Sequence, residues 1–135
     1  MSDPVQPGQQ RQPVRATSPC LVVSNLGQSI TFYCDKLGFT EPTLWGDPPC
    51  FVMMHRDGFD VMLSLAEAPD RVHPNGPYGV WDLYIQVDDV RVEAAAFEAA
   101  GVPLDADLCD TEYQMTEIEI VDPDGYRICF GSPKD

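Results

Sequence analysis

Hydrophobic and polar residues alternate over several short stretches of the chain, and two longer stretches have helical spacing. Residues 19–23 predict a short buried strand, and residues 26–36 predict a helix that begins after the capping pair Ser24-Asn25 and ends at Gly38. Three more strands are expected at residues 39–45, 50–54 and 60–65, separated by turns rich in Gly, Pro and Asp. The first half of the chain therefore predicts one β-α-β-β-β unit.

The same order of elements returns in the second half. A strand at residues 81–87 leads into a helix at residues 90–100, which Asp88-Asp89 caps and Gly101 ends. A tight hairpin is expected at residues 122–125, where Pro and Gly supply the turn conformations. The inward helix positions Leu26, Ile30 and Tyr33 recur 64 residues later as Val90, Ala94 and Phe97. This regularity indicates an internal duplication.

These elements predict an α+β fold of two tandem βαβββ modules. The first module is expected at residues 17–65 and the second at residues 81–135. Residues 66–80 are rich in Pro and Gly and form the expected linker. Residues 1–16 are rich in Gln and Pro, and we expect a disordered arm there.

The charge of the chain is strongly negative, with a formal net charge of −14. Residues 1–80 hold eight acids and five bases, giving −3, whereas residues 81–135 hold fourteen acids and three bases, giving −11. Such a field repels nucleic acids and anionic membranes and attracts cations. Two interpretations stay open: a solvated surface that keeps the protein soluble, or an acidic groove for a cationic ligand.

The sequence also bears on location and redox state. We find no apolar run that approaches the ~20 residues needed to span a bilayer, and no leader of the secretory type, so cytoplasmic residence is expected. Five cysteines without a CxxC pair predict free thiols rather than a disulfide framework or a structural zinc site.

Three motifs resemble those of a known superfamily. They are residues 23–33 (VSNLGQSITFY) running into Leu37-Gly38-Phe39, residues 86–90 (QVDDV) and residues 122–126 (DPDGY). In this order they resemble the vicinal-oxygen-chelate superfamily, which includes glyoxalase I, extradiol dioxygenases, fosfomycin-resistance proteins and bleomycin-resistance proteins. The resemblance covers residues 18–132. It implies one domain whose two modules form a curved mixed sheet with a U-shaped cleft, in a homodimer.

Metal-dependent members of that superfamily carry His, Gln or Glu ligands on the first and last strands of each module. The resemblance places these positions at Ser18, Met62, Asp82 and Cys129. Asp82 is the one ordinary ligand for a hard metal, and Cys129 suits a soft metal. We therefore expect no metal, no other cofactor and no catalytic residue, with Asp82 and Cys129 as weak metal candidates.

The resemblance also assigns one face of each sheet to the cleft, and strand alternation then sorts the other residues. The opposite positions are uniformly apolar and are expected to pack beneath the helices. Phe51 and Trp81 are expected in the core, whereas Trp45 and Tyr113 stay open as cleft aromatics. Besides Ser18, Cys20, Val22 and Ser64, the cleft-facing set comprises the expected ligand-binding residues Asp60, Met62, Asp82, Tyr84, Gln86, Glu117, Glu119, Arg127, Cys129, Trp45 and Tyr113.

Two functional hypotheses follow. The first is a small-molecule binding protein similar to bleomycin-resistance proteins, which sequesters a cationic or aromatic ligand in an acidic cleft without a catalytic metal and so confers antibiotic resistance. The second is a glyoxalase- or dioxygenase-type enzyme that is metal-independent or uses a non-standard metal set around Asp82 and Cys129.

Overall fold

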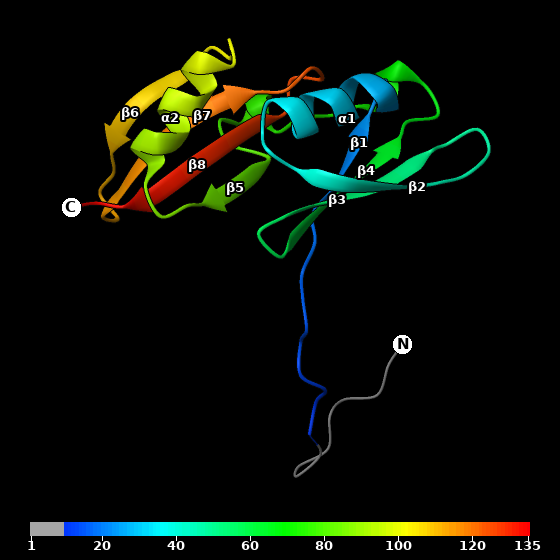
Figure 1. The fold of residues 1–135 in the computed structure, drawn as a ribbon, viewed down its shortest axis with the longest axis horizontal. Helices are drawn as coiled ribbons and strands as arrows, with labels where there is room; N and C mark the ends of the chain where they lie inside the picture. Colours follow the sequence, from blue (N-terminus) through cyan, green and yellow to red (C-terminus); the bar gives the residue numbers. More distant parts are fainter. Residues whose placement is uncertain (1–9) are drawn as a thin grey trace.

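The computed structural model describes residues 10–135 and contains the two predicted βαβββ modules (Figure 1). The first module consists of β1 (Cys20–Val23), α1 (Leu26–Asp35), β2 (Thr40–Trp45), β3 (Phe51–Arg56) and β4 (Phe59–Leu65). The second consists of β5 (Leu83–Gln86), α2 (Val90–Ala99), β6 (Ala106–Asp110), β7 (Met115–Val121) and β8 (Arg127–Pro133). Two short 3₁₀ turns, η1 (Pro69–Arg71) and η2 (Gly76–Tyr78), lie between the modules.

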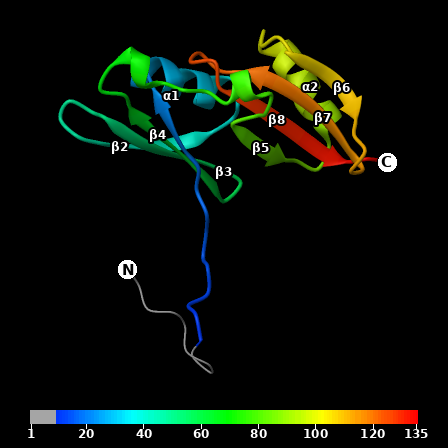
Figure 2. The same cartoon turned by 180° about the vertical axis from the view of Figure 1, so that it is seen from behind.

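The strands form two separate four-stranded mixed sheets, ordered β1-β4-β3-β2 and β5-β8-β7-β6. In each sheet the first strand pairs in parallel with the last, and the other pairs are antiparallel. The sheets lie side by side, and α1 and α2 cover the same side of the molecule in both views (Figures 1 and 2). The predicted α+β fold is confirmed, although the sheets do not close into one cleft within the chain.

Of the expected arm, residues 1–9 lie outside the described part of the chain. Residues 10–16 are exposed and are assigned to neither helix nor strand. Within residues 10–135, no helix is long and apolar enough to cross a membrane.

Local chemistry explains where the helices begin and end. Asn25 accepts a hydrogen bond from the Gln28 amide at 2.9 Å, and Asp89 accepts one from the Arg91 amide at 3.0 Å. Gly101 has a positive φ of 75° and follows α2 in a turn where the Val102 amide donates to the Phe97 carbonyl at 2.9 Å. Each helix is one residue shorter than predicted.

The alternation in the strands correctly predicts most of the core. The helix-facing strand residues Leu21, Val23, Val61, Leu63, Ile118, Ile120, Ile128 and Phe130 are all buried. Phe51 is a correction, because it pairs with Ser64 in the ladder and therefore points away from the helices, against Trp45 at a ring-centroid distance of 5.5 Å. Trp81 also lies outside the core and packs against Tyr84, with ring centroids 5.3 Å apart.

The buried carboxylate of Asp122 joins the two modules. Tyr33 of α1 donates its hydroxyl to Asp122 Oδ2 at 2.7 Å, while Asp122 Oδ1 accepts from the amides of Asp124 and Tyr126, each at 2.9 Å. Tyr126 in turn donates its hydroxyl to the carbonyl of Val22 in β1 at 2.6 Å. A turn of the second module thereby binds both the helix and the first strand of the first module.

Removing the Tyr33 hydroxyl should weaken this junction. Tyr33→Phe leaves Asp122 Oδ2 buried without its donor, so we expect the free energy of unfolding to fall by about 1–3 kcal/mol. Urea denaturation at neutral pH measures the change. Tyr78→Phe is the matched control, because Tyr78 is 84% exposed and its loss should change stability by less than about 0.5 kcal/mol. Equal stability of the two variants would contradict the assigned role of Tyr33.

The same hydroxyl should make stability fall at alkaline pH. Burial, and then the neighbouring Asp122 carboxylate, raises the pKa of Tyr33 well above its ordinary value of 10.0. The folded protein then retains a proton that the unfolded chain loses, so the stabilisation is complete below pH 10.0 and is lost above it. Between pH 9 and pH 11, the urea midpoint of Tyr33→Phe should therefore fall less than that of the wild type. Parallel falls would show that the hydroxyl makes no such contribution.

Candidate functional site

A groove with a volume of about 810 Å³ lies between the two modules. From the first module it is lined by residues of the β3–β4 turn (residues 56–61), by Phe39, and by Thr17 and Pro19, which precede β1. From the second module it is lined by residues 83–89, which include all of β5, and by Val92 and Glu93 in the first turn of α2. This volume is within the usual range for small-molecule sites.

The groove is acidic. Five carboxylates line it, against a single basic residue, Arg56. That guanidinium is already paired with Glu93 of α2 and lies 3.8 Å from Asp57, so it leaves little positive charge free. The five carboxylates are those of Asp57, Asp60, Asp88, Asp89 and Glu93.

Apolar surface lies beside these carboxylates. Phe59 is 76% exposed and Val92 is 65% exposed, and both line the groove together with Leu83 and Ile85 of β5. Because β5 is the terminal strand of its sheet, its outer edge pairs with no other strand within residues 10–135. The groove therefore offers negative charge, apolar contact and backbone hydrogen-bonding groups together.

Three cross-strand rows make up the face of the first sheet that points away from α1, which we call the first-module face. Ladder pairing places Val22, Ser64, Phe51 and Trp45 in one row, and Cys20, Met62, Met53 and Thr43 in the next. Asp60, His55 and Thr40 form the third row, in which Asp60 bonds the Nδ1 atom of His55. Trp45 is 48% exposed at the outer edge of this face.

The corresponding face of the second sheet, the second-module face, is closed by its own side chains. Tyr113 donates its hydroxyl to Glu117 Oε2 at 2.6 Å, and Glu117 is only 7% exposed. The Tyr84 hydroxyl is buried beside Glu117 and has no hydrogen-bond partner within residues 10–135. Gly131 makes room for it, because a Cβ atom there would lie 2.1 Å from Tyr84 Oη.

This packing raises three pKa values on the second-module face. The hydrogen bond to Glu117 raises the pKa of Tyr113 to about 12, and burial is the main cause of a raised pKa at Tyr84. Burial, and then the Glu117 carboxylate, raises the pKa of the fully buried Cys129 thiol to about 12. Because the Cys129 side chain is fully buried, a metal ion or a substrate has no open approach to it from solvent.

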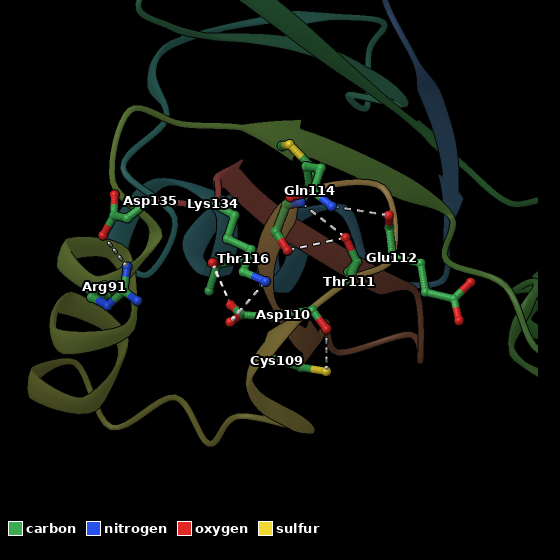
Figure 3. A network of polar contacts seen from close by, with 10 residues as sticks. Arg91, Cys109, Asp110, Thr111, Glu112, Gln114, Thr116, Lys134 and Asp135 are labelled. Carbon is green, nitrogen blue, oxygen red and sulfur yellow. Dashed lines mark hydrogen bonds and ion pairs between the residues drawn. The ribbon is translucent and has the colours of Figure 1, made fainter.

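A polar network fixes the loop that carries Tyr113 (Figure 3). Thr111 Oγ1 lies 3.1 Å from both the amide and the carbonyl of Met115, and Thr116 donates its hydroxyl to Asp110 Oδ1 at 2.8 Å. Lys134, which follows β8, lies 3.9 Å from the same Asp110 carboxylate. These contacts hold Tyr113 over Glu117.

The candidate metal position at Asp82 does not fit a hard cation. Asp82 Oδ1 accepts from the Asn75 amide at 2.7 Å, and Oδ2 accepts from the Arg127 amide at 2.8 Å. Both oxygens therefore anchor the linker and β8. Within residues 10–135, no three His, Cys, Asp or Glu side chains are grouped so that they could hold a metal ion.

The structure does not bring the expected ligand-binding residues together in one place. Asp60, Tyr84 and Gln86 line the groove. Trp45 and Met62 lie on the first-module face and do not line the groove. Glu117, Cys129 and Tyr113 lie in the closed cluster, while Glu119 pairs with Arg127 at 3.1 Å. Arg127 also pairs with Asp105, so its charge is compensated.

Strand alternation missed the groove residues that lie in turns and helix starts. Asp57 has a positive φ of 51° in the β3–β4 turn, and Phe59 follows it. Asp88 and Asp89 precede α2, where the capping pattern alone marked them. The missing information was that the β3–β4 turn lies beside the start of α2, where Arg56 pairs with Glu93, because this depends on how the modules pack.

Comparison with known proteins agrees with this architecture. The family model described as Glyoxalase/Bleomycin resistance protein/Dioxygenase superfamily matches residues 15–130. A search of curated proteins gave no match.

Solved structures share the fold at low sequence identity. TnmS3, an antibiotic binding protein from Streptomyces sp. CB03234, has a TM-score of 0.73 and 21% identity, covering 93% of this chain and 100% of its own. A glyoxalase/bleomycin resistance protein/dioxygenase from Alicyclobacillus acidocaldarius has a TM-score of 0.71 and 18% identity, covering 93% and 96%. A virulence protein from Salmonella typhimurium has a TM-score of 0.70 and 20% identity, covering 91% and 99%.

With two βαβββ modules in the described residues and a family match over nearly the whole chain, this protein belongs to the glyoxalase/bleomycin resistance protein/dioxygenase superfamily.

Proposed function

We propose that this protein binds a small cationic molecule with an apolar or aromatic part, in the groove between its two modules. The observation that carries the proposal is the composition of the groove, in which five carboxylates and one already paired arginine surround exposed apolar side chains. Carboxylates attract a cationic group, and apolar contact holds the rest of the ligand.

The superfamily and its structural relatives support a binding role. TnmS3 is an antibiotic binding protein of the same fold. We extend a binding role of that kind to this chain, which would hold a toxic compound away from its target by sequestration. Chemistry on the ligand is not needed for this function.

The overall charge strengthens the local attraction. The net charge of −14 raises the local concentration of cations around the protein, and the groove lies against the more acidic second module. Exposed carboxylates each contribute modestly, roughly 0.2–1 kcal/mol to a neighbouring cation, because water and salt screen them. Affinity should therefore depend on several acids together and weaken as salt is added.

Neutralising two groove acids should weaken cation binding. In Asp57→Asn/Asp88→Asn, two exposed charges are lost while the turn conformation of residue 57 is retained, because asparagine also tolerates positive φ. We expect affinity for bleomycin or for the cationic aromatic dye proflavine to fall about three- to tenfold. Isothermal titration calorimetry at low salt measures it.

Two controls define the outcome. Asp70→Asn/Glu112→Gln removes the same charge from exposed positions outside the groove and should change affinity much less. Fluorescein, an anionic aromatic, should not bind. Equal loss in both double variants would show that only net charge matters, and an absence of binding by either cation at high micromolar protein would overturn the proposal.

We also propose that two copies associate, so that the first-module face of one lies opposite the second-module face of the other across a shared cleft. Each face leaves an aromatic side chain exposed, 48% for Trp45 and 56% for Tyr113. Light scattering after size exclusion should then give twice the chain mass of 15.0 kDa. A mass of one chain at micromolar concentration would contradict this association.

A further inference from the structure

Three sulfur atoms lie on neighbouring strands of the first-module face. The ladder pairs Cys20 of β1 with Met62 of β4, and it pairs Met62 with Met53 of β3. All three side chains therefore project from the same face, in one row across three adjacent strands. We call Cys20, Met62 and Met53 the sulfur row.

The spacing of the row allows its sulfur atoms to meet. Neighbouring strands are about 4.8 Å apart, and directly paired residues project side by side. Met62 lies between Cys20 and Met53, which are two strands apart, and the three rotatable bonds of a methionine side chain let Met53 reach toward the middle of the row. Cys20 is exposed and the two methionines are half-buried, so a small ion can reach the row from solvent.

The chemistry of the row is soft. Thiolate and thioether sulfurs favour Cu(I) and related soft ions, whereas Mg²⁺ and Ca²⁺ need oxygen ligands. On the same face of β4, the next residues on either side of Met62 are Asp60 and Ser64. Asp60 is bonded to His55, and Ser64 pairs with Phe51. Phe51 and Trp45 occupy the next row, on the side opposite to the His55–Asp60 pair.

Charge also fits a monovalent ion. Binding would replace the thiol proton of Cys20, which leaves to solvent, so one thiolate and one monovalent cation form a neutral group. A neutral group is compatible with the half-buried position of the methionines. The net charge of −14 favours approach of the cation.

We propose that Cys20, Met62 and Met53 form a binding site for a soft monovalent metal ion, Cu(I) or Ag(I). The site includes Met62, one of the four positions that the resemblance gives for metal ligands, but its other two residues lie on the first-module face and it uses neither Asp82 nor Cys129. It stands independently of the ligand groove, because none of its three residues lines that groove.

Another pair of sulfur atoms in the molecule serves as an internal comparison. Cys34 Sγ lies 3.9 Å from Met54 Sδ on the helix side of the same sheet. Met54 is fully buried in the core and Cys34 is half-buried, so this pair offers two sulfurs where the row offers three. Methyl signals of Met54 and Met53 therefore report on opposite faces of β3.

The test uses the full chain with Cys50→Ser/Cys109→Ser, which removes the other two exposed thiols. We expect one Ag(I) ion to bind, shifting the methyl NMR signals of Met53 and Met62 but not those of Met54 and Met115. Competition with bicinchoninate under anaerobic conditions gives the Cu(I) affinity. In this background Met62→Leu and Met53→Leu should each weaken it by about tenfold or more, because leucine keeps the volume but removes the sulfur.

Cys20→Ser should abolish tight binding, and Met115→Leu, a half-buried methionine of the other sheet, should leave it unchanged. Circular dichroism confirms folding of each variant. If Cys20→Ser alone lowers affinity while both methionine variants bind like the background protein, the metal is held by a single thiolate and the proposed site is wrong. If the methyl signals of Met53 and Met62 do not shift in the metal-loaded protein, this result alone would overturn the proposed site.

Discussion

The arrangement of this molecule depends on one buried carboxylate, that of Asp122. The two modules share no strand, so their relative position must come from contacts between side chains and loops. Asp122 accepts bonds from its own turn and from Tyr33 of the other module, and burial raises its pKa despite these donors. A buried acid is costly unless its oxygens are bonded, so the junction tolerates few alternative geometries. The hydroxyl of Tyr126 adds a bond to β1 from the same turn.

The groove follows from this junction. Once α1 and β1 are fixed against the 122–126 turn, the β3–β4 turn lies beside the start of α2, where Arg56 pairs with Glu93. A second bond, from Lys36 Nζ to the Ala100 carbonyl at 2.7 Å, joins the two helix ends. Of the two basic residues in these contacts, Arg56 lines the groove and Lys36 does not. The remaining groove carboxylates have no competing lysine or arginine among the groove-lining residues, so their field is directed at whatever enters.

Sequence alone could predict most of the fold, because the duplicated helix pattern and the alternation of apolar residues are local signals. It could not predict where the site lies. Strand alternation predicts which face of the sheet Asp82 points to. Only the structure shows that its two carboxylate oxygens accept hydrogen bonds from the backbone amides of Asn75 and Arg127. Phe51 was placed wrongly because the parity of β3 depends on its pairing with Ser64, a non-local register. The groove combines turn residues from one module with cap residues from the other, and no periodicity relates them.

The two module faces differ although both modules have the same β-α-β-β-β order. On the second-module face, Glu117 is surrounded by Tyr113, Tyr84 and Cys129 and accepts a hydrogen bond from the Tyr113 hydroxyl, so the face is already filled. The first-module face has no such interior acid. Phe51 holds the ladder position that Glu117 holds in the second sheet, and it stacks with Trp45 at the edge of the face. The same order of elements therefore carries one face that is filled by its own side chains and another whose polarisable side chains stay accessible.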